Sequence, residues 1–386
     1  MRIIHTADWH LGRSLKGKDR TPEIKFALDE LLTQAIALDV DAVLVAGDIF
    51  ETFNPPVEAE KVAYKFFCDL QAAQIPAVMI AGNHDSASRI DSVANLLSFV
   101  GVHALGKPRI AEDGGAIALN TKSGKLCVGA MPFASERRML APDELWLKDN
   151  LEQLQTYREI VSYLLSNLTS TFTDDSVNIL MAHLMIDGAK LAHSEKDFHS
   201  KGTYALPRQS LPPETQYIAL GHIHKRQQIE VTVPTYYSGS LIQVDFGEAD
   251  EEKGFYLVDV EPGTPATVDF IPIACQKPLK AIECELQDYP EKLEPHRHHP
   301  GYLKVIINLQ TPQIGLAEKI RKICPQVIHI EPRYPDTPKW EQSVRPQLDP
   351  VAEFHCYYQE ILGSTPTTAV VTRFKELYQE MDNATT

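Results

Sequence analysis

The sequence has no apolar run close to the ~18 consecutive residues that a membrane-spanning helix needs. Its first residues, MRIIHTADWHLG, lack the basic segment and the long apolar segment of a secretion signal. The six cysteines are scattered and form no CxxC pair, which argues against a disulfide framework and against a structural zinc site. We therefore expect a protein of the reducing cytoplasm with no membrane association.

Positive charge is also scarce, since 37 Lys and Arg stand against 52 Asp and Glu, for a net charge of −15. This balance argues against a bare basic nucleic-acid-binding module. It does not exclude nucleic acid as a substrate, because carboxylates that hold metal ions count as negative charge until the ions bind. With 44% hydrophobic residues in 386, the chain can fill globular cores, and its length suggests two to three domains at roughly 150 residues each.

The first 80 residues alternate between strand and helix patterns. Apolar runs predict strands over 3–7, 42–46 and 77–81, with a helix from Thr21 and another over 57–73 between them. Thr21 is expected to cap the first helix, with Pro22 in its first turn. Strand–helix–strand order predicts a parallel sheet with right-handed crossovers. A long helix is expected near 144–167, and shorter, more antiparallel strands up to residue 273, so the fold class is α/β.

The chain divides by pattern into three parts. Residues 1–275 form the first domain, and 276–335 have the strands and helices of a small α+β module. Five prolines within 331–350 predict a linker. Within 336–386, two amphipathic patterns predict short C-terminal helices, with apolar stripes at Val351, Phe354, Tyr357, Tyr358, Ile361, Val370, Val371, Phe374, Leu377 and Met381. Such helices are too short for a core of their own, so we expect them to dock on a partner; the alternative is that they pack on residues 1–340.

Polar clusters follow five of the expected strands, at the ends where α/β folds present ligand groups. They are Asp8-Trp-His10, Gly47-Asp48, Gly82-Asn-His-Asp85, His183 and Gly221-His-Ile-His224. On extended backbone, the Asp-x-His and His-x-His pairs would each project to one face. Oxygen and imidazole ligands together suit Mn²⁺, Fe²⁺ or Zn²⁺ better than Ca²⁺ or Mg²⁺ alone. Five unrelated turn motifs are a poorer explanation than one dinuclear metal site.

The ordered set DxH, GDxxE, GNHD, H, GHxH resembles that of the calcineurin-like metallophosphoesterases. Three longer segments are similar to the nuclease subunits in that family that work with an ATPase subunit: GDIFETFNPP at 47–56, ALGHIH at 219–224 and YSGSLIQVDFGE at 237–248. The resemblance implies two central mixed β-sheets flanked by helices, with a small α+β capping domain and C-terminal helices.

The resemblance also implies roles for individual residues. One metal ion would be held by Asp8, His10, Asp48 and His224. The second would be held by Asp48, Asn83, His183 and His222, with Asp48 bridging the two. His84 would steady the transition state or protonate the leaving oxygen, with Asp85 as its supporting partner. Glu51 stands where some relatives carry a further histidine.

A basic loop follows the first metal motif and contains Arg13, Lys16, Lys18 and Arg20. Such a loop can neutralise DNA phosphates beside the site. The alternative is an ordinary solvated turn. The same segment reads GxxxxGK, but it lacks the Ser or Thr that a phosphate-binding P-loop needs after the lysine.

The resemblance implies an Mn²⁺-dependent nuclease that acts as a double-strand DNA exonuclease and a single-strand or hairpin endonuclease in DNA repair, recombination and replication. It further implies a homodimer that joins ATPase subunits in a heterotetramer. Two other functions stay open: a stand-alone phosphatase or nucleotide phosphodiesterase, and a non-catalytic adaptor. The C-terminal extension favours the nuclease, because a phosphatase for small substrates has no need of a cap and docking helices. The intact ligand set argues against an adaptor.

Overall fold

The computed structural model describes residues 1–134, 150–192 and 205–335, and beyond them 351, 354, 355, 358 and 365–375. By packing, the chain divides into one unit of residues 1–307 with 313–332 and a second of 308–312 with 333–386. Each is described by itself. The expected boundary at 275/276 lies inside the first unit, and the three expected domains (1–275, 276–335 and 336–386) stay a prediction.

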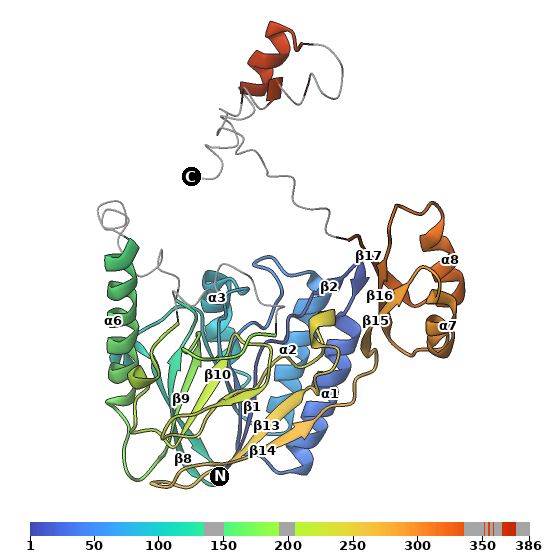
Figure 1. The fold of residues 1–386 in the computed structure, drawn as a ribbon. Coiled ribbons are helices and arrows are strands. Elements are labelled where there is room, and N and C mark those ends of the chain that lie inside the picture. The colour runs from blue at the N-terminus through green and yellow to red at the C-terminus, as the bar shows by residue number, and fades with distance from the viewer. Residues whose placement is uncertain are drawn as a thin grey trace. The chain divides into compact units, whose positions relative to one another are not determined.

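Two six-stranded mixed sheets form the centre of the first unit (Figure 1). The first has the order β14 (Thr267–Pro272), β13 (Gly254–Asp259), β1 (Arg2–Thr6), β4 (Ala42–Val45), β5 (Ala77–Ile80) and β6 (Val102–Leu105). The second has the order β11 (Gln227–Ile229), β12 (Thr235–Tyr237), β10 (Tyr217–Gly221), β9 (Val177–His183), β8 (Gly124–Met131) and β7 (Ala116–Thr121). Strands β1, β4, β5 and β6 are parallel to one another, as the alternating pattern predicts.

Helices cover the outer faces of both sheets. One core contains residues of α1 (Thr21–Ala37), α2 (Val57–Ala72) and α3 (Ala87–Ser98) together with the first sheet, and another joins α6 (Asn150–Thr169) to the second sheet. A third core fills the space between the sheets. In β4, Val43 and Val45 face the helices, whereas Ala42 and Leu44 face the other sheet. Burial on both faces explains why this strand is an unbroken apolar run. The expected α/β architecture is confirmed.

Helix α1 corrects one expectation. Thr21 is its first residue and does not cap it; Arg20 occupies the cap position without a side-chain cap bond. The Thr21 N–H instead donates to Asp19 Oδ1 at 2.9 Å. Pro22 lies in the first turn, as expected, because its missing N–H has no partner to lose there. Of the helix expected near 144–167, residues 144–149 lie outside the described residues.

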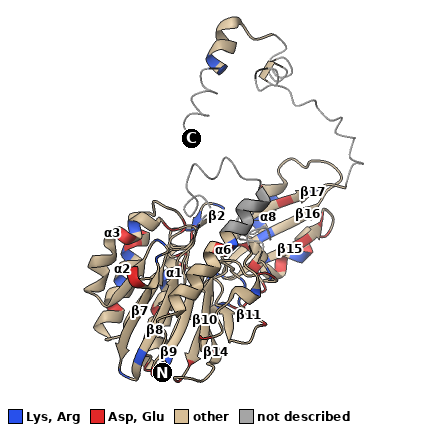
Figure 2. Ribbon diagram, turned by 90° about the vertical axis from the view of Figure 1, so that its left-hand side faces the viewer, with Lys and Arg blue, Asp and Glu red and all other residues tan. Residues whose placement is uncertain are grey.

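A small three-stranded sheet follows β14, the edge strand of the first large sheet, in the chain. Its order is β15 (Leu279–Glu285), β16 (Tyr302–Asn308) and β17 (Val327–Arg333), with helices α7 (Tyr289–Leu293) and α8 (Leu316–Ile323) between the strands. It packs on the rest of the first unit through Leu279, which joins Leu15 and Phe246 in one buried cluster. The Leu279 N–H also donates to Gln243 Oε1 at 2.8 Å. Acidic and basic residues are interspersed over this sheet and over α2 and α3 (Figure 2).

The second unit contains helical residues at 351, 354–355, 358 and 368–375. The rings of Phe354 and Phe374 stack at a centroid distance of 4.2 Å and an interplanar angle of 10°. The two predicted apolar stripes therefore meet each other at these residues. Tyr357, Ile361, Leu377 and Met381 of those stripes, and residues 336–350 of the predicted linker, lie outside the described residues.

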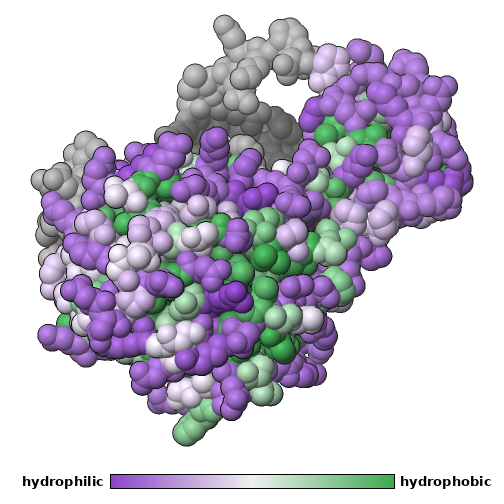
Figure 3. All heavy atoms as spheres, turned by 90° about the horizontal axis from the view of Figure 1, so that it is seen from below, coloured by the Kyte–Doolittle hydropathy of each residue, from purple (hydrophilic) through white to green (hydrophobic). Residues whose placement is uncertain are grey.

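The face at the start of the parallel strands carries no candidate site residue. Seen from below, Figure 3 shows apolar residues reaching the surface in the middle of this face, with hydrophilic residues around them. Half-buried apolar side chains pack against the core between the sheets at Met1, Tyr236, Ala266, Val268 and Phe270.

Among the described helices, none has the length and apolar character to cross a bilayer.

Candidate dinuclear metal centre

All the expected ligand residues lie at the carboxyl ends of parallel strands. Asp8 follows β1, Asp48 follows β4 and Asn83 follows β5, whereas His183 ends β9 and His222 follows β10. The two sheets meet here because glycines allow close approach. A Cβ on Gly221 would lie 1.9 Å from the Ala46 carbonyl oxygen, and one on Gly47 would lie 2.2 Å from His183 Nδ1.

The backbone at these strand ends is left-handed, not extended. The φ angles are 53° at Asp8, 54° at His10, 51° at Asp48 and 99° at His222. The expectation that Asp-x-His and His-x-His project their side chains from extended backbone is therefore wrong. Such conformations are strained for residues with a Cβ, by about 1–3 kcal/mol each, and they concentrate at functional sites. Here they turn each side chain inward at the end of its strand.

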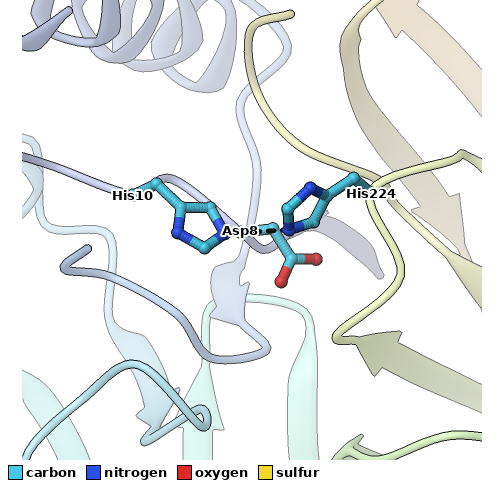
Figure 4. A group of neighbouring side chains, drawn as sticks. All are labelled: Asp8, His10 and His224. Carbon is cyan, nitrogen blue, oxygen red and sulfur yellow. Dashed lines mark hydrogen bonds between the residues drawn. The ribbon is translucent and has the colours of Figure 1, made fainter. Parts of the chain in front are cut away.

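Asp8, His10 and His224 form a first group whose ligand atoms lie within 4.8 Å of one another. Figure 4 shows the two imidazole rings pointing toward each other with the Asp8 carboxylate beside them. The Nε2 atoms of His10 and His224 are 3.0 Å apart. Burial lowers the pKa of His10 to about 4, so its ring is neutral near pH 7. Its Nδ1–H donates to Glu51 Oε2 at 2.8 Å, which leaves a lone pair on Nε2.

Asp48 connects this group to a second one. Its Oδ2 lies 3.8 Å from His10 Nε2 and 3.6 Å from His183 Nε2. The Asn83 Oδ1 in turn lies 3.1 Å from His183 Nε2 and 2.8 Å from His222 Nδ1. One carboxylate oxygen thus stands between two sets of ligand atoms, as a bridging ligand requires.

The charges of the centre fit cations. Burial raises the pKa of Asp8 to about 6, against the opposing effects of His183 and His224. Burial is the largest single effect and opposes ionisation of Asp48 as well, but His183, His84 and His10 together outweigh it and hold the pKa of Asp48 well below its ordinary value. Burial likewise opposes a charge on His183, but Asp48, Asp8 and the Ala46 carbonyl together outweigh it, so the pKa of His183 rises to about 9. Two buried carboxylates among four imidazoles and an amide oxygen are a donor set that suits two divalent metal ions.

His84 lies at the edge of this donor set. Its backbone N–H donates to Asp48 Oδ1 at 2.8 Å, and its Nδ1–H donates to the Glu51 carbonyl oxygen at 2.8 Å. Its ring packs edge-on against His10, with centroids 4.7 Å apart. These contacts fix the ring so that Nε2 is the nitrogen left for chemistry.

Asp85 does not support His84, which corrects the role expected from the resemblance. This fully buried carboxylate accepts three backbone N–H bonds, from Gly82 at 2.8 Å, Phe50 at 2.9 Å and Ile49 at 3.1 Å. Burial and the nearby charge of Asp48 raise the pKa of Asp85 to about 7. Asp85 therefore ties the loop after β4 to the loop after β5, and it contributes through backbone position.

Only some of the basic side chains of the expected DNA-binding loop are exposed to solvent. Residues Gly12 to Asp19 form a hairpin of β2 (Ser14–Leu15) and β3 (Lys18–Asp19), on which Lys16 and Lys18 are exposed. Arg20 is fully buried, where it pairs with Glu23 at 2.7 Å and stacks over the ring of Tyr302. Its expected contact with DNA phosphate is therefore wrong. The hairpin geometry also excludes a P-loop at this segment.

Arg13 is engaged as well, since its Nη1 donates to Glu51 Oε1 at 3.0 Å. Its side chain is 16% exposed. The expectation that Arg13 neutralises DNA phosphate beside the site thus competes with a charge partner that is already in place.

Sequence reasoning missed three groups around the centre. Glu51 was noted only as a substitute for a histidine, yet it contacts His10, Arg13 and, through its carbonyl, His84. Glu248 faces His224 Nδ1 at 3.3 Å from a position 24 residues away in the chain. The ring of Phe133 stacks on His222 at 6.0 Å. The segment YSGSLIQVDFGE contains Glu248, but no spacing rule in it identifies the contact with His224.

Comparison with known proteins agrees with this geometry. The family model of the calcineurin-like phosphoesterases matches residues 1–226, and that of the type 5 capsule protein repressor C-terminal domain matches residues 273–361. The SbcD subunit of the nuclease SbcCD from Bacillus subtilis is 32% identical over 390 residues, covering 98% of this chain and 97% of the relative. The SbcD subunit of the same nuclease from Escherichia coli is 30% identical over 301 residues, covering 77% and 74%.

A solved structure of a dimetal phosphatase from Danio rerio covers 70% of this chain and 98% of its own, at 12% identity and a TM-score of 0.42, which is too low for an argument about the site. The assignment to a family is based on the sequence matches and on the metal-ligand residues at the ends of the strands. This chain is a metal-dependent phosphodiesterase of the calcineurin-like fold and belongs to the SbcD family of nuclease subunits.

Proposed function

We propose that the chain is an Mn²⁺-dependent DNA nuclease, a double-strand exonuclease and a single-strand or hairpin endonuclease, that works with an SbcC-type ATPase in DNA end processing, repair, recombination and replication. One observation carries the chemistry: the Asp48 Oδ2 atom stands 3.8 Å and 3.6 Å from the Nε2 atoms of His10 and His183, between two groups of ligand atoms. The substrate and the partner are proposed from the two relatives described above, which are both named as subunits of a nuclease.

We assign the first ion to Asp8, His10, Asp48 and His224, and the second to Asp48, Asn83, His183 and His222. When bound, two such ions would supply positive charge to the phosphodiester and would lower the pKa of a water that attacks it. Manganese is the proposed ion because the set mixes imidazole nitrogens with carboxylate and amide oxygens; Mg²⁺, Fe²⁺ and Zn²⁺ are the other candidates.

The chain's own residues supply the proton and the positioning. His84, held by the Glu51 carbonyl and by Asp48, is the proposed general acid, because its Nδ1–H is committed and Nε2 can carry a proton to the leaving oxygen. Asp85 keeps the loops of Asp48 and Asn83 in register through three backbone bonds. Fixed loops matter because small errors in the distance between reacting atoms cost large factors in rate.

Lys16 and Lys18 are the proposed DNA contacts of the basic loop, since both side chains are exposed on the hairpin next to the centre. Exposed lysines bind backbone phosphate without reading sequence, in keeping with a nuclease that acts at DNA ends. Arg13 remains a candidate only if phosphate displaces Glu51.

The helices beyond the linker are the proposed docking segment for the ATPase subunit. Phe354 and Phe374 already stack on each other, so the partner would bind the paired helices. A homodimer that joins two ATPase subunits in a heterotetramer, located in the cytoplasm, is part of this proposal.

One set of digestions tests the proposed function. The full-length protein is incubated with Mn²⁺ and duplex DNA, hairpin DNA or a nitrophenyl phosphodiester, with and without the ATPase and ATP. We expect hairpin cleavage by the chain alone and ATP-stimulated degradation of duplex ends with the partner. Hydrolysis of the small ester with no cleavage of any DNA would favour the stand-alone phosphodiesterase. A chain that ends at Pro346 should keep ester hydrolysis and lose co-purification with the ATPase.

A further inference from the structure

On the side of His10 that faces away from the metal centre, the imidazole contacts a carboxylate that is itself paired with an arginine. His10 Nδ1–H donates to Glu51 Oε2 at 2.8 Å, and Arg13 Nη1 donates to the other oxygen of Glu51 at 3.0 Å. The Glu51 side chain is 21% exposed, and that of His10 is fully buried. The row is therefore guanidinium, carboxylate, imidazole, ending at the Nε2 atom that faces the centre.

Behind His224 the same order of groups recurs on different elements. Glu248 Oε1 lies 3.3 Å from His224 Nδ1, and Lys253 Nζ lies 2.8 Å from the other oxygen of Glu248. The hydroxyl of Ser240 and the N–H of Val244 also donate to that second oxygen, at 3.0 Å and 3.1 Å. The side chains of Glu248 and Lys253 are 0% and 4% exposed, so this ammonium–carboxylate–imidazole row is more deeply buried than the first.

Both rows of hydrogen-bonded groups end at imidazole nitrogens that face the same metal site. A carboxylate only accepts hydrogen bonds, so each imidazole carries its hydrogen on Nδ1 and presents a lone pair at Nε2. Those two Nε2 atoms are 3.0 Å apart (Figure 4). A negative charge behind an imidazole makes the opposite nitrogen a stronger donor to a metal ion and fixes the ring's direction.

One imidazole of the second group, that of His183, has a different support. His183 Nδ1–H donates at 2.7 Å to the carbonyl oxygen of Ala46, a neutral acceptor. The ring direction is fixed there as well, because Gly47 and Gly221 allow the strands to close around it. The carbonyl, however, adds no full negative charge to the imidazole it holds.

We propose that Glu51 and Glu248 are positioning residues that make the Asp8–His10–His224 group the tighter of the two metal sites, so that it fills first and the site of Asn83, His183 and His222 fills second. This inference rests on the proposed two-metal centre and adds an order of loading to it. The weaker ion would then be the exchangeable one, and its concentration would set the activity.

Calorimetric titration of the metal-stripped full-length protein with Mn²⁺ tests the order. Wild type should bind two ions in two resolved steps, and His183→Ala should lose the weaker step, which assigns the steps to the sites. Glu51→Gln keeps an acceptor for His10 and removes the charge, so it should weaken the tighter step about 10–100-fold and leave the weaker one in place. Glu248→Gln leaves the Lys253 ammonium paired with Glu251 at 2.8 Å and bonded to the His224 carbonyl oxygen at 3.0 Å, so this single variant should weaken the same step.

Glu60→Gln is the matched control, because Glu60 also pairs with an arginine, Arg89, at 2.7 Å, and its side chain is 18% exposed. It should change neither step. Equal weakening of both steps in Glu51→Gln, weakening of the weaker step alone, or no change would each overturn the proposal, as would two equal sites in wild type. Two resolved steps in a protein that cleaves no DNA would sustain the loading order and overturn the proposed nuclease.

Discussion

Replacing Asp85 with asparagine tests whether this carboxylate works on the substrate or on the backbone around it. Its Oδ2 accepts from the N–H groups of Gly82 and Ile49, and its Oδ1 accepts from Phe50. An asparagine oxygen can keep the first two bonds, but its amide nitrogen then faces the Phe50 N–H. One buried donor is left without an acceptor, which costs about 1–3 kcal/mol.

The hydrogen bonds from Gly82 and Ile49 are weakened because their acceptor no longer carries a negative charge, and this costs about 1 kcal/mol of stability for each bond. This loss is offset, because burial and Asp48 raise the pKa of Asp85 to about 7 and the neutral amide avoids that penalty. A rise of that size corresponds to about 4 kcal/mol at pH 8 and nearly cancels the loss, so Asp85→Asn should change the free energy of unfolding by about 1 kcal/mol or less. Metal affinity should fall, since Asp48 and Asn83 lie on the loops that Asp85 ties together.

Urea denaturation of the metal-stripped protein at pH 8 measures the change in the free energy of unfolding. Hydrolysis of a nitrophenyl phosphodiester at a series of Mn²⁺ concentrations measures the catalytic rate and its dependence on metal. Asp91→Asn is the control, because Asp91 Oδ1 accepts one backbone N–H, from Gly106 at 2.8 Å, which asparagine can retain. It should cost less than about 1 kcal/mol. If Asp85→Asn needed no more Mn²⁺ than wild type for half-maximal activity yet were ~10²–10⁴-fold slower at saturating metal, the range for a general acid or base, the positioning role would be wrong.

Asp48→Asn should lose metal and hydrolysis while the chain stays folded, because the bridging charge is gone and so is part of the repulsion among apo carboxylates; two ions per chain by elemental analysis would contradict the bridging role. His84→Ala should keep both ions and bind DNA but hydrolyse it ~10²–10⁴-fold more slowly, and loss of metal would show instead that His84 is a ligand. Lys16→Ala with Lys18→Ala should lower the salt dependence of DNA binding by ~0.9 per lost phosphate contact, with ester hydrolysis intact; a parallel fall in both activities would indicate a structural hairpin. His5, whose pKa burial lowers to about 3, binds a proton more readily unfolded than folded, so stability falls as the pH drops below about 6.5. Between about pH 7 and pH 5 the metal-stripped wild type should lose about 2 kcal/mol more than His5→Phe in urea titrations, and parallel curves would contradict this.

Local sequence patterns were enough to predict the fold class and the place of the site. Ala42–Val45 and Ala77–Ile80 are apolar at every position because each lies in a sheet covered on both faces, and that pattern is local. The residues directly after such strands must emerge at one edge of a parallel sheet. Asp8, Asp48 and Asn83 were therefore placed together without any knowledge of the packing.

Which side chains support that site depends on contacts between distant segments of the folded chain. Whether Arg20 contacts DNA or pairs with Glu23 depends on β16, the strand of the small sheet that carries Tyr302. The contact between Glu248 and His224 depends on a chain reversal after β10. The left-handed backbone at Asp8 and His10 is likewise held by bonds from another strand end: their N–H groups donate to the carbonyls of Gly47 and Asp48. Periodicity and spacing describe one segment at a time, whereas these roles arise from contacts between segments that pack together only after folding.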